Sequence, residues 1–267
     1  MTGLLLYKVC ITMLAVLGLS FVAEKISVRL AGLLSGYPIG TAIILHFYGL
    51  EYGANFAANA AVFNLCGFLA SQCFAYTYYR ISHRTSSIAR TSILALLGYL
   101  VPACIISQLN PDRLMALTIA IIATSLFCIL LFSSKSQKVA IPRTWSTSLV
   151  AGRLIFTASL VLIVTEFADL IGPNWAGVFS AFPVALYPLV VLLHKEYGPE
   201  TAQTILGNFP YGLWSVITYA LTVSLVYPSY GVIWGTLVGF AAATAVLIVI
   251  GIKPMLLYLR RPRQNAI

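Results

Sequence analysis

The chain has 267 residues, of which 60% are hydrophobic and only 9% are charged. A soluble domain of this length needs no such apolar fraction, because a globular interior is filled well before every segment becomes apolar. The formal net charge of +9 would suit a nucleic-acid-binding protein, but in a membrane protein it records basic cytoplasmic loops. The composition therefore predicts an integral membrane protein with the lipid bilayer, not nucleic acid, as its partner.

Apolar stretches of about 20 residues, each long enough to cross a hydrocarbon core as a helix, recur along the whole chain. We expect the first to be retained as a helix, because it has neither a basic leader nor a small-residue cleavage site. Breaks at charged and turn-forming residues predict nine transmembrane helices, at 3–23, 26–49, 54–79, 88–108, 112–132, 148–168, 174–194, 200–226 and 230–252.

The basic residues indicate an orientation. With nine spans, fourteen of the sixteen Lys and Arg residues fall on one side, and only Lys8 and Arg113 fall on the other. Basic residues accumulate in cytoplasmic loops, so we expect a multi-pass protein of the bacterial inner membrane. Its amino terminus would face the periplasm and its carboxyl terminus the cytoplasm.

The sequence contains an internal repeat, in which residue n matches residue n+145 without a gap over 4–77. The clearest match is the motif Ala-Gly-x-x-Ser-x-x-Pro, which ends at Pro38 and again at Pro183. Charge follows the same register, since Lys8 aligns with Arg153. Chance alignment of apolar helices would match Leu and Val rather than Pro, Gly and charged residues, so the repeat indicates a duplication.

The two copies begin at spans one and six, so an odd number of spans separates them and they lie in opposite orientations. The sequence thus predicts an all-α membrane protein with nine transmembrane helices, in which two inverted four-helix repeats are joined by a linker helix. Inverted repeats of this kind are found in many secondary transporters. The expected units are a first repeat at 1–110, a linker helix and basic cytoplasmic loop at 111–145, a second repeat at 146–255 and a basic tail at 256–267.

One set of residues in the second copy is shared with a known group of proteins. They are Ala176-Gly177, Phe182-Pro183, His194, Gly198 and Trp214-Ser215. Over roughly residues 150–250 the chain resembles the small membrane proteins of the GlpM-like family and the related DUF3147 group. The first copy departs from the pattern at Tyr37 and at 69–70. The resemblance implies a bacterial inner-membrane location and no settled substrate.

Small residues and prolines mark the second and seventh spans. Gly32, Gly36 and Gly40 recur every four residues, which lets helix backbones approach closely. Pro38 and Pro183 fall near mid-membrane, where each removes a backbone donor, so we expect these helices to be kinked or broken. Paired interrupted helices point to a central transport site. The alternative is that the prolines merely bend a tightly packed helix pair.

Polar side chains near the same level are few. Asn64 and Asn208 lie near the middle of spans three and eight, and a buried amide needs a neighbouring helix, water or a ligand as its partner. Interhelical bonding and ligand binding both remain open for them. The candidate substrate-binding residues are Ser35, Tyr37, Pro38, Asn64, Ser180, Pro183, Asn208, Tyr211 and Trp214.

Charged residues inside membrane spans are energetically costly, so those that occur often have a function. Glu166 is the one acid placed deeply enough to carry a coupling proton or cation, although it could also cap its span at the interface. Arg153, at the cytoplasmic end of the same helix, could extend to the surface. Glu51 and Glu196 precede glycine turns, where we expect acids to support the start of the next helix.

Catalytic and nucleotide-binding motifs are absent from the sequence: it has no GxSxG, HExxH or P-loop pattern. We therefore expect no enzyme activity, no ATP-driven pump, no cofactor and no metal site. The favoured function is a secondary transporter or permease for a small neutral, zwitterionic or anionic solute. The alternatives are a scaffold subunit in envelope biogenesis, which would use the glycine stripe for a partner helix or a second copy, and a narrow ion channel lined by the two asparagines.

Overall fold

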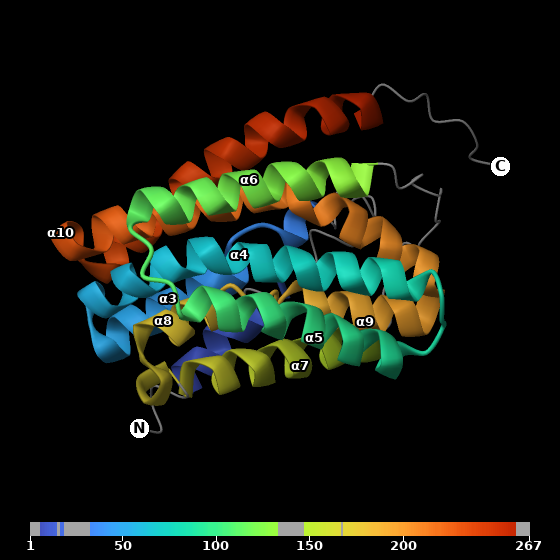
Figure 1. The fold of residues 1–267 in the computed structure, drawn as a ribbon, viewed down its shortest axis with the longest axis horizontal. Coiled ribbons are helices and arrows are strands. Elements are labelled where there is room, and N and C mark those ends of the chain that lie inside the picture. Colours follow the sequence, from blue (N-terminus) through green and yellow to red (C-terminus); the bar gives the residue numbers. More distant parts are fainter. Residues whose placement is uncertain (1–5, 15–16, 19–32, 133–146, 167, 260–267) are drawn as a thin grey trace.

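The computed structural model describes residues 6–14, 17–18, 33–132, 147–166 and 168–259 (Figure 1). Nearly all of these residues are helical, and none of them lies in a strand. Short helical stretches at 6–14 and 33–35 precede the longer helices. These are α3 (Ile39–Tyr52), α4 (Ala54–Ser82), α5 (Ile88–Ser107), α6 (Arg113–Phe132), α7 (Thr147–Glu166), α8 (Ala168–Ser180), α9 (Leu186–Tyr197) and α10 (Pro199–Leu259).

Five helices of the described chain are long and apolar enough to cross a membrane. They are α3 with the residues before it, α4, α5, α6 and α10. Large apolar side chains are exposed mainly on α5, α6 and the second half of α10, which suits contact with lipid rather than water. The prediction of a helical protein with membrane-spanning segments is confirmed at this level, and the number of nine spans stays a prediction.

Helix α4 lies at the centre of the bundle and packs against α3, α5, α6, α8 and α10 (Figure 1). Close approach depends on small residues: a Cβ at Gly67 would lie 2.7 Å from the Cβ of Ala181. Further along α4, the ring of Phe74 meets the rings of Phe182 and Tyr187 edge-on, at 5.7 and 5.2 Å between centroids. The core thus joins α4 to the segment between α8 and α9.

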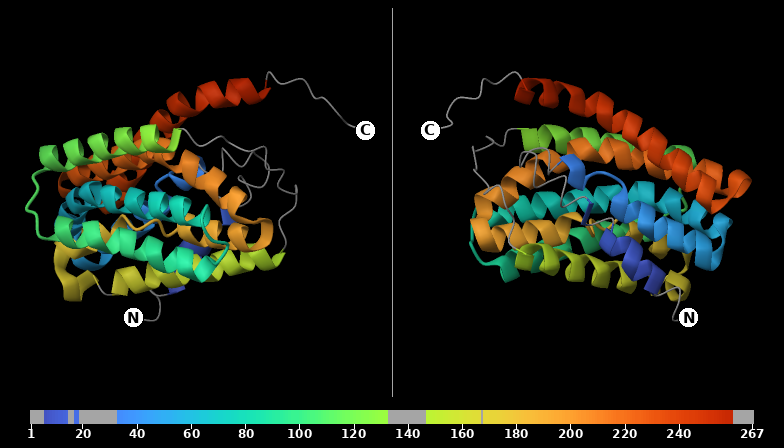
Figure 2. Two further views of the ribbon diagram at one scale, coloured as in Figure 1. Left: turned by 45° about the vertical axis from the view of Figure 1, so that its right-hand side comes forward. Right: turned by 180° about the vertical axis from the view of Figure 1, so that it is seen from behind.

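Helix α10 consists of two legs that meet at Gly231, whose φ of 77° is a conformation that other residues rarely adopt. The legs run back along each other, because the Tyr227 hydroxyl lies 2.8 Å from Thr236 Oγ1 and a Cβ at Gly239 would lie 2.9 Å from the Tyr219 ring. Figure 2 shows the second leg on the outside of the bundle. The reversal falls between the predicted spans 200–226 and 230–252.

The spans that contain Pro38 and Pro183 are both interrupted, as predicted. The helical stretch at 33–35 stops at Gly36–Pro38, after which α3 begins at Ile39. Helix α8 stops at Ser180, and residues 181–185 lead into α9. Each interruption frees backbone groups that an unbroken helix would pair.

Two glycine turns follow the broken spans. Gly53, between α3 and α4, has a φ of 93°, and Gly198, between α9 and α10, has a φ of 86°. A side chain at either position would be strained, so glycine permits each sharp turn. Pro199 then opens α10 at its first position, where the missing N–H costs nothing.

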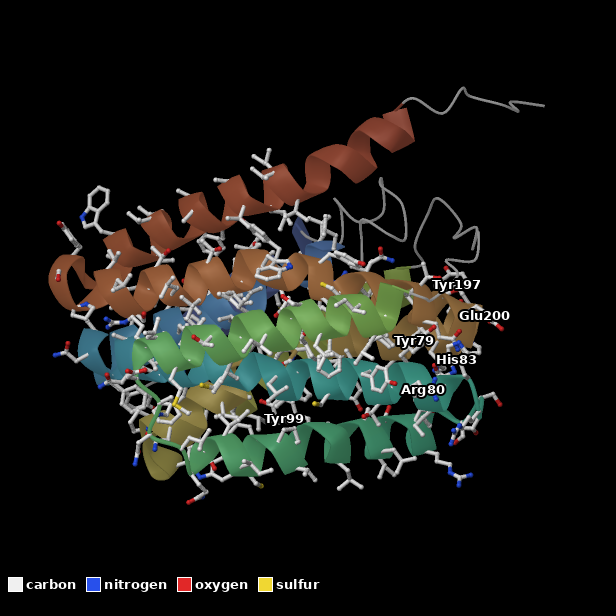
Figure 3. The ribbon with its side chains drawn as sticks, turned by 45° about the horizontal axis from the view of Figure 1, so that its top comes forward. Tyr79, Arg80, His83, Tyr99, Tyr197 and Glu200 are labelled. Carbon is white, nitrogen blue, oxygen red and sulfur yellow. The ribbon has the colours of Figure 1, made fainter. Side chains whose placement is uncertain are left out.

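The bundle has two ends, which are named here by a residue of each. The Lys8 end holds Lys8 with Glu51, at the close of α3. The His83 end holds the connection from α4 to α5 together with Glu200, in the first turn of α10. Figure 3 shows His83 and Glu200 near each other at that end.

Candidate functional site

The two helix interruptions pack against each other inside the bundle. A Cβ at Gly40 would lie 2.5 Å from Val184 Cγ2, so the start of α3 touches the segment before α9. A cavity of ≈30 Å³ lies at this crossing, about the volume of one water molecule. It is lined by Ser35, Gly36, Tyr37, Gly40, Thr41, Phe68, Ala181, Phe182, Pro183, Val184, Ala185, Phe209, Leu213 and Val216.

Several predicted site residues do lie at this crossing. Ser35, Tyr37 and Pro183 line the cavity, and Pro38 is buried at the first interruption. The hydroxyl of Tyr37 lies 2.8 Å from Thr244 Oγ1 on the second leg of α10, which fixes its ring beside the cavity. The sequence motif around each proline thus places these residues together.

Asn64 and Ser180, also predicted site residues, form a direct hydrogen bond. The Asn64 amide Nδ2 donates to Ser180 Oγ at 2.7 Å, and Ser180 Oγ in turn donates to the carbonyl of Gly177 at 2.7 Å. The side chain of Asn64 is completely buried, and its Oδ1 has no hydrogen-bond partner among the described residues. Neither residue lines the cavity itself, but Asn64 lies one turn before Phe68 and Ser180 immediately precedes Ala181, and Phe68 and Ala181 do line it.

Hydroxyl groups from α3, α4 and α5 satisfy the carbonyls at the end of α8. Tyr99 donates to the carbonyl of Val178 at 2.6 Å, and Thr41 donates to that of Ser180 at 3.4 Å. Ser71 also donates to the carbonyl of Ala181 and Tyr48 to that of Ala176, while the Tyr48 hydroxyl lies 3.3 Å from the carbonyl of Val164 on α7 as well. A freed carbonyl in an apolar interior needs such partners. Figure 3 shows Tyr99 in the interior of the bundle.

Sequence reasoning missed these hydroxyl donors. Tyr48, Ser71 and Tyr99 belong to helices whose apolar patterns give no reason to single out one hydroxyl. Their role depends on which carbonyls are freed across the bundle, and that becomes visible only in the folded chain.

Three predicted site residues lie on other faces of α10. Asn208 is half-buried and donates to the carbonyl of Thr204 in its own helix at 2.7 Å. The hydroxyl of Tyr211 reaches the carbonyl of Cys128 on α6 at 3.5 Å, and Trp214 is half-buried. The cavity face of this helix is instead apolar, formed by Phe209, Leu213 and Val216. The structure therefore does not bring Asn208, Tyr211 and Trp214 to the cavity.

An ion cluster at the Lys8 end involves Glu166. Lys8 Nζ lies 2.7 Å from Glu51 Oε1 and 2.9 Å from Glu166 Oε1, with the lysine side chain 2% exposed and that of Glu166 54% exposed. Glu166 is thus an acid at the end of α7 that already has a cation as its partner.

The helix-start role expected of Glu51 is wrong. Glu51 lies in the last turn of α3, and α4 has no acid in its first turn and no side-chain cap. Its carboxylate pairs with the buried Lys8 instead. Arg153 is also not at the surface: it is buried, with 1% of the residue exposed.

A larger, polar recess of ≈390 Å³ lies at the His83 end, between the α4–α5 connection and the start of α10. Gln203 Nε2 donates to Ser82 Oγ across it at 3.2 Å. His83 from the α4–α5 connection and Glu200 from α10 both line it, and they lie near each other in Figure 3. The lining residues are Ser82, His83, Arg84, Thr85, Ser86, Pro199, Glu200 and Gln203.

Within the described part of the chain, no group of three or more His, Cys, Asp or Glu residues could hold a metal ion. No protein-family model, no curated protein and no solved structure matches the chain. The resemblance to the GlpM-like and DUF3147 proteins stays a prediction.

Proposed function

We propose that this protein is a secondary transporter or permease for a small solute, with its site where the two interrupted helices cross. One observation carries the proposal: the interruptions at Pro38 and Pro183 meet at a cavity inside the bundle. Irregular backbone at membrane depth occurs where it is buried in protein or lines a cavity, and paired broken helices are typical of transport sites.

The proposal includes two inverted four-helix halves, and the backbone supports them. Four hydrogen bonds around the first interruption recur around the second with an offset of 145 residues. One of these is the bond from Gly36 N to the Leu33 carbonyl, which recurs from Ala181 N to the Val178 carbonyl. The turns at Gly53 and Gly198 share their unusual conformation at the same offset.

Contacts between the halves follow the same offset. A Cβ at Gly36 would lie 2.6 Å from the backbone of Gly212, and one at Gly67 would lie 2.7 Å from Ala181. Gly36 corresponds to Ala181, and Gly67 corresponds to Gly212. Each interruption therefore packs on the central helix of the other half, as expected for two copies related by a two-fold axis.

Nine spans in the bacterial inner membrane complete the proposal. Helices α4 to α7 and the two legs of α10 coincide with predicted spans, whereas part of the first two spans falls outside the described residues. At the Lys8 end lie Lys8 and Arg113, whose guanidinium donates to Ser224 near the close of the first leg. At the other end lie Arg80, Arg84, Arg90, Arg153 and Lys195. This separation favours a cytoplasmic His83 end and a periplasmic Lys8 end.

The chemistry of the cavity favours a neutral or zwitterionic solute. None of its lining residues is charged, and its polar groups are hydroxyls and freed backbone groups. A volume of ≈30 Å³ is too small for a metabolite, so the proposal requires this crossing to open before a solute binds. Asn64 Oδ1 has no hydrogen-bond partner among the described residues, and in this proposal it would accept a hydrogen bond from the solute.

The alternatives fit the structure less well. A scaffold would present the glycine stripe to a partner helix, but Gly36 and Gly40 are used for contacts within the chain. A channel would need Asn64 and Asn208 along one water-filled path, but Asn208 is bonded within its own helix and does not line the cavity.

Solute fluxes would test the proposal. Uptake and efflux of a metabolite panel should be compared in cells and proteoliposomes with the wild-type chain, Asn64→Ala, Ser180→Ala and the control Asn208→Ala. We expect a flux of at least one solute that Asn64→Ala and Ser180→Ala abolish and Asn208→Ala retains. If no solute moves, or if alanine is tolerated at 64 and 180 while Gly36→Ala is not, an assembly role replaces transport.

A further inference from the structure

Two opposite charges line the recess at the His83 end. Arg84, in the α4–α5 connection, and Glu200, in the first turn of α10, are both exposed. Among the described residues the ion pairs are those of Lys8, and neither the guanidinium of Arg84 nor the carboxylate of Glu200 has a hydrogen bond. The recess therefore offers one cationic and one anionic group to a ligand from outside the chain.

The rest of the lining adds polar groups beside Arg84. Thr85 and Ser86 follow it in the connection, and His83 precedes it. His83 Nδ1 donates to a carbonyl in the last turn of α4 at 2.8 Å, which leaves Nε2 of the ring for a ligand. A guanidinium with neighbouring hydroxyls suits a phosphate group, whereas the carboxylate of Glu200 suits a cation. The volume of ≈390 Å³ lies in the range of small-molecule sites.

The length of α4 places the recess at the depth of lipid headgroups. At a rise of about 1.5 Å per residue, the 29 residues of α4 span roughly 43 Å, which is the thickness of a bilayer with its headgroup regions. The last residue of this helix, Ser82, lines the recess. Tyr79 and Tyr197 are half-buried near the same end, as Figure 3 shows, and tyrosine is typical of the boundary between membrane and water.

Exposed apolar side chains lead from this end of the bundle into the hydrocarbon. Ile93, in the second turn of α5, is 59% exposed, and Ile129, in the last turn of α6, is 70% exposed. Helix α5 follows directly on the connection that lines the recess. Helix α6 packs against α4 at the same end, where the rings of Tyr76 and Phe127 are 5.8 Å apart. A lipid whose acyl chains lie on these helices would have its headgroup at the level of the recess.

We propose that this recess binds the headgroup of a phospholipid that carries both a phosphate and a primary ammonium group. Arg84, Thr85 and Ser86 hold the phosphate, and Glu200 holds the ammonium. The two charges of the headgroup thus meet the two free charges of the recess. The inference stands apart from the transport proposal, because it uses none of the residues at the helix crossing.

The charges of the recess select among headgroups. A headgroup with a phosphate but no cation leaves Glu200 unpaired, and a quaternary ammonium has no N–H to donate to this carboxylate. Phosphatidylethanolamine therefore fits better than phosphatidylglycerol or phosphatidylcholine. Soluble glycerophosphoethanolamine has the same polar chemistry, but the depth of the recess and the exposed apolar helices beside it favour the lipid.

Native mass spectrometry would test the inference. The full chain, stripped of lipid in detergent, is mixed with equal amounts of phosphatidylethanolamine, phosphatidylglycerol and phosphatidylcholine that have the same acyl chains, and the bound lipids are identified by mass. We expect phosphatidylethanolamine to be retained about threefold more than either of the others, because Glu200 adds one exposed ion pair to the phosphate contacts that all three share.

Removal of each charge should have a different effect. Arg84→Gln should weaken the binding of all three lipids about threefold, because each lipid has a phosphate. Glu200→Gln should remove the preference for phosphatidylethanolamine and leave the other two lipids bound at least as well as before. Arg90→Gln and Glu196→Gln are the matched controls, at exposed charges of the same end that do not line the recess, and they should change neither result.

Equal retention of the three lipids would overturn the inference, and so would a preference for phosphatidylethanolamine that survives Glu200→Gln. The same holds if Glu196→Gln removes the preference as fully as Glu200→Gln does, or if Glu200→Gln unfolds thermally like the wild type yet loses all three lipids. Soluble glycerophosphoethanolamine, added at the concentration of the lipids, should leave the lipid bound. Displacement of the lipid would show that the recess takes a free zwitterion, and the lipid would then be the wrong ligand.

Discussion

At the scale of single residues, the amide of Asn64 ties α4 to the end of α8. Replacing it with alanine removes the donor to Ser180 Oγ and leaves a small void in a fully buried site. We expect Asn64→Ala to lower the free energy of unfolding by about 1–2 kcal/mol. Asn208→Ala loses only a hydrogen bond within its own helix, so it should lower the free energy of unfolding by less than about 0.5 kcal/mol. Thermal unfolding in one detergent would compare them, and equal losses would contradict the assignment of Asn64 to a bond between helices.

Glycine at position 36 is required by the backbone of α10. A Cβ there would lie 2.6 Å from Gly212, and backbone cannot yield as a flexible side chain can. We expect Gly36→Ala to destabilise the protein by about 1–3 kcal/mol, measured by thermal unfolding. Gly152→Ala is the control, because its Cβ would meet Leu192 at an ordinary 3.6 Å. It should be neutral or stabilising, since alanine favours a helix. A neutral Gly36→Ala would show that the two helices are not in close contact there.

Single residues differ in how well the sequence predicts them. The interruptions at Pro38 and Pro183 were predictable from the paired motif that carries these prolines, although proline alone does not decide, since Pro102 lies inside α5 without interrupting it. Tyr99 was not, because its partner is a carbonyl on another helix, far away in the chain. For Trp214 the helix was predicted, but the face of that helix that lines the cavity was not, since Phe209, Leu213 and Val216 line it instead.

At the scale of elements, the interruption after α8 is held by side chains from other helices. Tyr99→Phe removes the hydroxyl that donates to Val178 and leaves the aromatic packing in place. We therefore expect amide hydrogen exchange in residues 181–185 to become about fivefold faster, as local opening becomes easier. Exchange at 36–38 should not change.

Tyr211→Phe is the matched control, since its hydroxyl makes only a long 3.5 Å bond to α6. It should leave exchange at 181–185 as in the wild type. Equal protection in Tyr99→Phe and the wild type would mean that the backbone bonds at the interruption suffice on their own.

Helix boundaries were predicted well where the chain itself enforces them. The turns at Gly53 and Gly198 and the reversal at Gly231 rest on glycine conformations that other residues avoid. The interruptions were predicted only as kinks or breaks. Their length depends on the packing of residues 181–185 against α4, which local sequence cannot specify.

At the scale of the whole molecule, the two halves are interlocked rather than merely adjacent. Each interruption packs on the central helix of the other half, through Gly36 with Gly212 and Gly67 with Ala181. The repeat is a prediction that rests on matching residues along one chain. The crossing could not be predicted in this way, because two copies could also pack side by side without exchanging contacts.

Interlocking predicts the behaviour of a divided chain. If the chain is cut within 133–146 and the two parts are expressed together, we expect them to co-purify through a tag on one part. Buried polar groups such as the Asn64 amide and the Tyr99 hydroxyl have their hydrogen-bond partners, Ser180 and Val178, in the other half. Neither half alone can supply these partners. Each part expressed alone should therefore aggregate or be degraded, since it exposes these polar groups and its small residues to lipid.

Gly36→Leu in the first part should abolish co-purification, because the leucine side chain would overlap the backbone of Gly212 in the second part. Gly152→Ala in the second part is the matched control and should leave co-purification unchanged. A first part that is monodisperse on its own, unfolds cooperatively and ignores the second part would instead mean that the halves are independent units. The crossing of the interrupted helices would then not be the centre of the fold, and a transport site placed there would lose its structural basis.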